Sequence, residues 1–259
     1  MTNPLQLYWQ PGCTSCLRTR EFLREHGIVF ESINVRTDAA AFASLRDRGL
    51  RTVPVLCRGL DYVLAQDLDE VARFVGIRLQ RIRLSPAKLL QRLDSLLDAA
   101  EQLTYQLPPA RMLDKLPQRE RSWLDLAYHI PMIVEGYLAA ARGGVLTYQH
   151  YELTPPAALQ NPTEIGAVTA HLRAQLRTWA QATASDGQLA DRPLETYFGV
   201  RPLHTVLERT TWHVAQHCRQ LEQLVQSSID PPPESRLGEA MLAGLPLPAS
   251  IWDPEVTDA

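Results

Sequence analysis

The stretch Leu5–Cys16, which reads LQLYWQPGCTSC, decides how the first part of this chain folds. Its apolar start favours a short buried strand, and Pro11-Gly12 ends that strand. The next segment, Cys16–His26, has helical apolar spacing and is followed by Gly27, a typical helix stop. The sequence therefore predicts a strand, a sharp turn, and a Cys-x-x-Cys pair at the N-terminus of a helix.

Residues 1–79 continue to alternate between strand-like and helix-like patterns. After the first strand and helix, the expected elements are a strand, a helix, a strand, a shorter strand and a helix, at Ile28–Val35, Asp38–Arg48, Val53–Arg58, Tyr62–Leu64 and Asp67–Val75. A strand–helix–strand start implies a right-handed crossover and a parallel pair, and the final hairpin adds antiparallel strands. We therefore expect an α/β domain over residues 1–79.

Residues 86–227 have a helical pattern instead. Helices are expected from 86, from about 118 to 141 with a bend at Pro131, from 162 to about 182, and from 202 to about 227. Four helices of this length favour a four-helix bundle. The connections 143–160 and 184–201 are long, and residues 228–259 form a Pro-rich tail that we expect to extend over the surface.

Composition limits the classes of partner. The 259 residues carry a formal net charge of -3, which gives no broad electrostatic reason to bind nucleic acid or an anionic membrane. No apolar run is long enough to span a bilayer, and the start lacks a signal-peptide pattern. Four cysteines are too few for a disulfide scaffold, so we expect a cytoplasmic protein whose Cys-x-x-Cys is redox-active or metal-binding.

The Cys-x-x-Cys pair has a physical rationale as a reaction centre. The N-terminus of a helix carries partial positive charge and free N–H groups, which favour a thiolate at Cys13. Cys13 is then the expected nucleophile, and Cys16 the thiol that resolves a mixed disulfide. Half of a zinc site is the alternative, although Cys57 and Cys218 are isolated and supply no second pair.

A second group of candidates is the histidines of the helical region. His213 and His217 are four residues apart, so they share one helix face and could chelate zinc, nickel or iron. A metal site needs a third ligand, and His129, in an apolar stretch, is the best candidate. Asp125, one turn before His129, could orient a ligand. A hydrogen-bonded core histidine is the alternative for His129.

Residues 5–77 resemble the glutaredoxin family in the stretch around Cys13 and Cys16, in Thr52-Val53-Pro54, and in the hairpin and last helix. The resemblance implies a thioredoxin-like fold and a cis Pro54 against the dithiol. It also implies that the backbone of Thr52, Val53 and Pro54 pairs with bound glutathione and that Asp67 holds the glutathione amino group. Ala65 stands where the family has glycine, and a plain helix cap is the alternative role for Asp67.

Residues 86–226 resemble the DinB/YfiT-like four-helix bundles. The resemblance rests on Leu124–Ile130, which contains His129, and on Trp212–Leu221, which contains His213 and His217. It implies that these three histidines hold one divalent metal ion. Several branches of that family use a low-molecular-weight thiol in transfer or isomerisation.

Together these features predict a thiol-dependent transferase, isomerase or reductive enzyme. It would use glutathione or a similar small thiol, with a divalent metal, on an electrophilic substrate that the sequence does not name, and would act alone or as a homodimer. Two alternatives stay open at this point. One is a metal-dependent hydrolase with a regulatory dithiol, and the other is a non-enzymatic redox or metal sensor.

Overall fold

The computed structural model describes residues 3–117 and 119–254. The chain forms two compact units. The first contains the residues up to Arg81 together with the segment that begins at Pro248, and the second contains Ile82–Leu247. The second unit is therefore inserted, in sequence, within the first.

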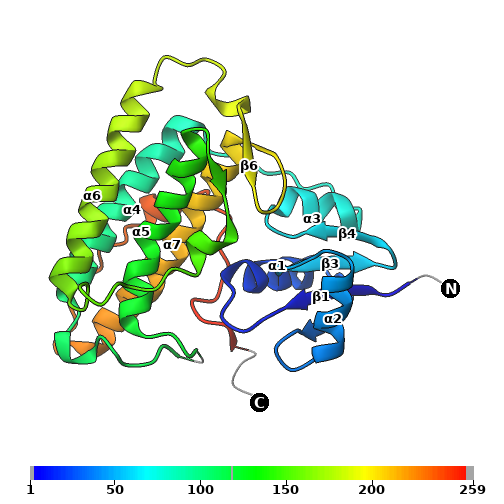
Figure 1. Ribbon diagram of the computed structural model, residues 1–259, viewed down its shortest axis with the longest axis horizontal. Coiled ribbons are helices and arrows are strands. Elements are labelled where there is room, and N and C mark those ends of the chain that lie inside the picture. The colour runs from blue at the N-terminus through cyan, green and yellow to red at the C-terminus, as the bar shows by residue number, and fades with distance from the viewer. Residues whose placement is uncertain (1–2, 118, 255–259) are drawn as a thin grey trace. The chain divides into compact units, whose positions relative to one another are not determined.

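The first unit is a four-stranded sheet with helices (Figure 1). Its elements are β1 (Leu5–Trp9), α1 (Thr14–Glu25), β2 (Glu31–Asn34), α2 (Ala39–Asp47), β3 (Val55–Arg58), β4 (Asp61–Leu64) and α3 (Leu68–Val75). The strand order is β2-β1-β3-β4. Strands β1 and β2 are parallel, whereas β3 is antiparallel to β1 and to β4, as the crossover and hairpin patterns predict.

Alternation along β3 divides the core of this unit between the two faces of the sheet. Leu56 joins the cluster that contains Leu23 of α1 and Val71 of α3. Its neighbours Val55 and Cys57 join a second cluster, with Leu45 of α2. Helices α1 and α3 therefore pack on one face and α2 on the other, and the N-terminus of α1 follows directly on the end of β1.

A segment from far along the chain completes the first unit. The buried carboxylate of Asp253 pairs with the buried guanidinium of Arg20 on α1. On the next residue of α1, the Glu21 carboxylate accepts the backbone N–H groups of Ala249 and Ser250, at 2.6 and 3.0 Å. The Arg20 guanidinium also lies 4.2 Å from the centre of the Trp9 ring, at the end of β1.

Replacing Asp253 with alanine is expected to destabilise the first unit strongly, because Arg20 loses a charged partner inside the protein. Breaking a buried ion pair from one side costs about 3–5 kcal/mol. Urea unfolding of the full chain, followed by the fluorescence of Trp9 and the other tryptophans, measures this loss. Asp47→Ala, at an exposed position of α2, is the control and should change the unfolding midpoint little. Equal midpoints for the two variants would contradict the structural role of Asp253.

The second unit is built on four long helices (Figure 1). They are α4 (Pro86–Gln106), α5 (Trp123–Ala141), α6 (Pro162–Ala182) and α7 (Leu203–Ser228). Helix α4 packs against α6 and α7, and α5 packs against the same two helices. The shorter elements are η1 (Pro109–Arg111), β5 (Val145–Leu146), η2 (Tyr148–Tyr151), η3 (Leu189–Asp191), β6 (Pro193–Thr196), β7 (Arg201–Pro202) and α8 (Glu239–Leu242).

Three features of the helical unit and of the tail differ from the sequence predictions. Helix α5 begins at Trp123, because Ser122 and Asp125 form a reciprocal capping box there; residue 118, the expected start, lies outside the described residues. The two long connections contain strands β5, β6 and β7, which form a small sheet. The Pro-rich tail is not simply extended over the surface: it contains α8, and its later part belongs to the first unit.

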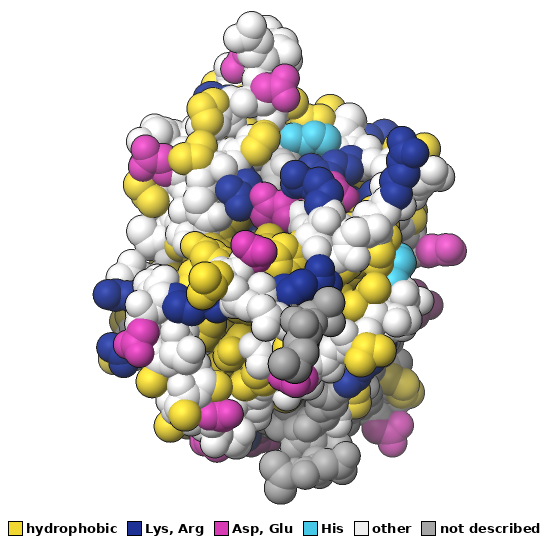
Figure 2. Space-filling model, turned by 90° about the vertical axis from the view of Figure 1, so that its right-hand side faces the viewer, with side chains coloured by type: hydrophobic (Ala, Val, Ile, Leu, Met, Phe, Trp, Pro, Cys, Tyr) yellow, Lys and Arg dark blue, Asp and Glu magenta, His cyan; other side chains and the backbone are white. Residues whose placement is uncertain are grey.

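Within the described residues, none of the helices combines the length and apolarity needed to cross a bilayer. On the face drawn in Figure 2, basic and acidic side chains are interspersed with hydrophobic ones. Charges of the two signs therefore partly cancel over this face.

Candidate functional site

The two cysteines of the Cys-x-x-Cys pair lie at the start of α1. Cys13 is the N-cap residue, and its Sγ accepts the backbone N–H of Cys16 at 3.2 Å. The two residues form a disulfide, with their Cα atoms 5.1 Å apart. Cys16 is fully buried, whereas Cys13 is partly exposed. Of the two sulfur atoms, Cys13 Sγ is therefore the one that an external reactant can reach, and the helix N-terminus stabilises negative charge on it.

The loop before β3 lies against this pair. The Val53–Pro54 peptide bond is cis, and the Val53 carbonyl oxygen lies 3.9 Å from Cys13 Sγ. Val53 and Pro54 are buried, while Thr52 is half-buried. The backbone of this loop is thus placed where a peptide-like ligand disulfide-bonded to Cys13 could pair with it.

Gln66 was not singled out from the sequence, yet this buried residue joins three parts of the dithiol site through its side chain and its backbone. Its amide nitrogen donates to the Val53 carbonyl at 3.3 Å, and its amide oxygen accepts the Ser15 hydroxyl at 3.1 Å. Its backbone carbonyl accepts a hydrogen bond from the buried Arg18 at 2.9 Å. A glutamine between β4 and α3 carries no local signal for this role, because the partners come from distant positions in the chain.

Asp67 caps α3, and its carboxylate accepts the Asp69 N–H at 2.9 Å. The turn before it accommodates the methyl group of Ala65, which is fully buried and donates its N–H to the Pro54 carbonyl at 3.0 Å. Asp67 therefore acts as the helix cap that the sequence offered as one of its two roles. Its side chain is half-buried and lies in the same turn as Gln66.

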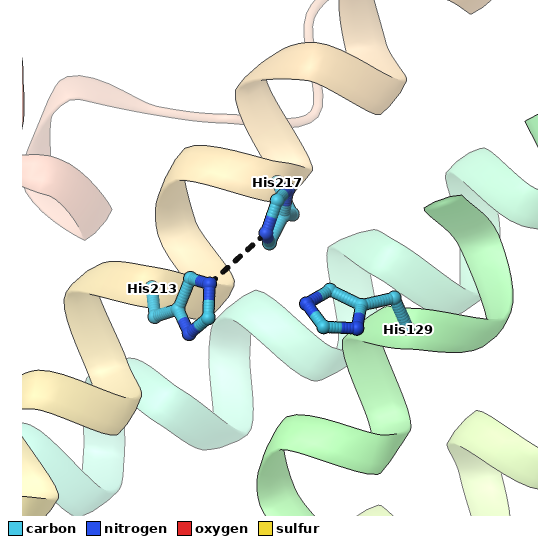
Figure 3. Close-up of side chains that lie close together, drawn as sticks. All are labelled: His129, His213 and His217. Carbon is cyan, nitrogen blue, oxygen red and sulfur yellow. Dashed lines mark hydrogen bonds between the residues drawn. The ribbon is translucent and has the colours of Figure 1, made fainter. Parts of the chain in front are cut away.

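The structure brings His129, His213 and His217 together (Figure 3). His129 lies on α5 and faces the two histidines of α7, which are one helical turn apart. One nitrogen from each of the three rings lies within 4.8 Å of the others, and the Nε2 atoms of His213 and His217 are 3.1 Å apart. All three side chains are buried, at 5%, 6% and 2% exposure.

Burial keeps the imidazoles of His129 and His217 neutral, as metal ligands must be. It lowers the pKa of His217 to about 3, and the nearby Arg119 adds to this effect. Burial, then His217 and Arg121, hold the pKa of His129 well below its usual range. Both rings therefore present free lone pairs at neutral pH.

Hydrogen bonding orients the ring of His217. Its Nδ1 lies 2.8 Å from the Gln220 amide oxygen, one turn further along α7. Because that oxygen can only accept, Nδ1 carries the proton, and Nε2 is left with its lone pair toward the other histidines. Asp125 does not orient a histidine, contrary to the sequence hypothesis: its carboxylate accepts hydrogen bonds from the Ser122 backbone N–H and hydroxyl at the start of α5.

Three other histidines of the helical unit lie outside this group. His150 caps the η2 turn through Thr147, and His204 bonds the Leu84 carbonyl at 2.7 Å. His171 lies on the exposed side of α6.

The metal-free protein is expected to lose stability in acid. Since the folded-state pKa of His217 and His129 is depressed, the unfolded chain binds these protons more tightly. The two neutral histidines contribute fully to the free energy of unfolding above about pH 6.5, which is the pKa of histidine in the unfolded chain. This contribution falls by up to a few kcal/mol as the pH is lowered toward 3. Urea midpoints measured against pH with a chelator test this. His217→Gln should flatten the profile and His171→Gln should not; a profile unchanged by His217→Gln would contradict it.

Comparison with known proteins bears on the first unit. The glutaredoxin family model matches residues 5–61, which include the dithiol and Thr52-Val53-Pro54 but not Asp67. A comparison of the chain with curated proteins finds no match. The α/β sheet and helices of the first unit fit the thioredoxin-like fold, and the Cys13–Cys16 pair at disulfide distance supports thiol redox activity.

Proposed function

We propose that the chain is a glutathione-dependent thiol–disulfide enzyme whose helical unit carries a divalent metal for a thiol-dependent transfer, isomerisation or reductive step. The observation that carries the proposal is the position of Cys13: its sulfur caps α1 and accepts the Cys16 N–H. The match of residues 5–61 to the glutaredoxin family model supports the same chemistry.

The dithiol chemistry follows from which sulfur is accessible. In the reduced protein, the Cys13 thiolate attacks the glutathione sulfur of a mixed disulfide; the Cys13–glutathione bond forms and the substrate thiolate leaves. A second glutathione thiolate then attacks that bond, which releases glutathione disulfide and restores Cys13. When Cys16 attacks Cys13 instead, glutathione leaves and the Cys13–Cys16 disulfide forms.

Glutathione is the thiol that the glutaredoxin family uses. Its binding here is supported by the Val53 carbonyl, 3.9 Å from Cys13 Sγ, and by the cis Pro54 that follows. The backbone of Thr52, Val53 and Pro54 would pair with the glutathione backbone, and Asp67 would accept its amino group. Gln66, which precedes Asp67, connects the turn that carries Asp67 to the loop of Thr52, Val53 and Pro54 through its hydrogen bond to the Val53 carbonyl.

The three-histidine group is the proposed metal site. Two nitrogens bound at about 2.1 Å to one tetrahedral or octahedral ion are separated by about 3.0–3.4 Å. The separation of 3.1 Å between the His213 and His217 Nε2 atoms agrees with this. The buried Nδ1 of His129 has no hydrogen-bond partner in the part of the chain that the structure describes, so the protein leaves this ring incompletely satisfied.

An ion bound by the three histidines would supply Lewis acidity that holds a small thiol as its thiolate. The ligand set suits zinc, nickel and iron alike. The resemblance of residues 86–226 to the DinB/YfiT-like bundles supports the same assignment, and Gln220 would hold the His217 ring in place as a ligand.

A coupled assay tests the proposal. The full chain, as purified and after zinc loading, is assayed for reduction of 2-hydroxyethyl disulfide by glutathione, and its metal content is measured in parallel. We expect glutathione-dependent turnover and one divalent ion per chain. Absence of turnover would contradict the redox assignment, and absence of bound metal would contradict the site in the helical unit.

A further inference from the structure

One face of α1 is bound to the turn formed by Ala65 and Gln66, which lies between β4 and α3. The buried side chains of Ser15, Arg18 and Thr19 have i, i+3 and i+4 spacing, so they share this face of the helix. The Thr19 hydroxyl donates to the Ala65 carbonyl at 3.2 Å, and Arg18 donates to the Gln66 carbonyl at 2.9 Å. The Ser15 hydroxyl donates to the side-chain amide oxygen of Gln66 at 3.1 Å. The turn is therefore fixed to the helix that begins at the dithiol.

The same turn holds two successive carbonyl groups of the loop that precedes β3. The Ala65 N–H donates to the Pro54 carbonyl at 3.0 Å, and the side-chain amide of Gln66 donates to the Val53 carbonyl at 3.3 Å. The Val53 oxygen lies 3.9 Å from Cys13 Sγ. Because a carbonyl oxygen accepts two hydrogen bonds, the bond from Gln66 leaves it able to accept one more, beside the reactive sulfur.

The orientation of the Gln66 amide is set by its two partners. The Val53 carbonyl can only accept a hydrogen bond, so the amide nitrogen faces it and the amide oxygen faces the Ser15 hydroxyl. Gln66 is 3% exposed, so water competes little for either bond. A leucine at this position could fill a similar volume but could not donate to Val53.

We propose that Gln66 is a positioning residue that makes Cys13 selective for thiols with a peptide backbone. In this role its amide orients the Val53 carbonyl, so that the remaining acceptor position of the oxygen receives the backbone N–H of a thiol that is disulfide-bonded to Cys13. The inference rests on the proposed glutathione chemistry and adds a residue that gives this chemistry its selectivity. A thiol without a backbone amide, such as 2-mercaptoethanol, has no N–H for this position and gains nothing from Gln66.

Exchange between two thiols on Cys13 tests the proposal. The full chain with Cys16→Ser is converted to its Cys13–glutathione adduct and equilibrated with reduced glutathione and 2-mercaptoethanol. The mercaptoethanol thiolate attacks Cys13 Sγ, a new disulfide forms, and glutathione leaves as its thiolate. Intact-protein mass spectrometry gives the ratio of the two adducts, and a short cysteine peptide in the same buffer gives the intrinsic ratio of the two thiols. We expect the protein to favour glutathione more than the peptide does, and Gln66→Leu to reduce this preference by at least about three-fold.

Further variants separate this role from a loss of stability. Because both adducts involve the same sulfur, a general change in the reactivity of Cys13 cancels from the ratio. Gln6→Leu makes the same substitution on β1, where Gln6 donates to Glu31 at 2.8 Å, and should keep the full preference. Gln66→Leu combined with Ser15→Ala replaces both ends of one buried hydrogen bond by apolar groups, so it serves as the test if the single variant is unstable.

The outcomes are distinct. If the chain with Cys16→Ser shows only the ratio of the peptide, glutathione is not bound through its backbone, and both the proposed glutathione site and the role of Gln66 fail. If that chain favours glutathione and the Gln66 variants retain the preference, Gln66 has no positioning role while the glutathione proposal stands. An equal loss in Gln6→Leu would show that the preference follows stability, and would also overturn the role of Gln66.

Discussion

Replacing Cys13 with serine is expected to abolish glutathione-dependent disulfide reduction, with a loss of at least about a thousand-fold. The hydroxyl of serine is not ionised at neutral pH, so the group that caps α1 can no longer attack a disulfide. Replacing Cys16 with serine should preserve the first attack, because its sulfur is buried and acts only on Cys13. We therefore expect Cys16→Ser to accumulate a glutathione adduct on Cys13, measured by intact-protein mass spectrometry.

Cys57 supplies the matched control for these variants. It lies in the same unit, on β3, but it is fully buried, and burial raises the pKa of its thiol. Cys57→Ala should therefore keep its turnover. Full activity in Cys13→Ser, or a glutathione adduct that forms on Cys57 rather than Cys13, would show that the nucleophile has been assigned wrongly.

Replacing His129 with alanine is expected to reduce the metal content of the chain from about one ion to nearly none. Two imidazoles from α7 alone leave an ion weakly held, since stable sites of this kind have at least three protein ligands. Loss of the ion should also lower the melting temperature of the helical unit, because a ligand that binds only the folded state stabilises it by mass action. Elemental analysis and thermal melts with and without a chelator measure both effects.

His171→Ala and His204→Ala are the controls for the metal prediction. His171 is exposed on α6, and His204 bonds a backbone carbonyl at the start of α7. Both should retain the ion. If His129→Ala also retained the ion, other groups would hold it, and the three histidines would be a hydrogen-bonded core cluster rather than a metal site.

The features that could be predicted from the sequence are those set by residues that are close together in the chain. The glutaredoxin-like prediction is confirmed over residues 5–61, because a strand, a turn and a dithiol follow one another there. The helical character of the later region is also confirmed, and the helix starts at Pro86 and Pro162 follow from the local caps Ser85 and Asn161. The DinB-type assignment and the metal remain predictions.

The parts that could not be predicted depend on contacts between distant residues. The role of Gln66 arises only when β4 and α3 bring it to Val53. Strands β5 and β7 have two residues each, too few to show an alternating pattern. Arg209 looks like a surface residue of an amphipathic helix until Tyr151 and Tyr197, from two separate connections, enclose it.

The return of the chain to its first unit has a consequence for biosynthesis. The ribosome releases the sheet and α1 early, but Asp253, the partner of Arg20, follows only after the whole helical unit has been made. Domains generally fold as units during synthesis, N-terminal part first. Here the ion pair between Arg20 and Asp253 cannot form until α4 to α7 have been translated. The inserted unit can therefore fold before the unit that precedes it is complete.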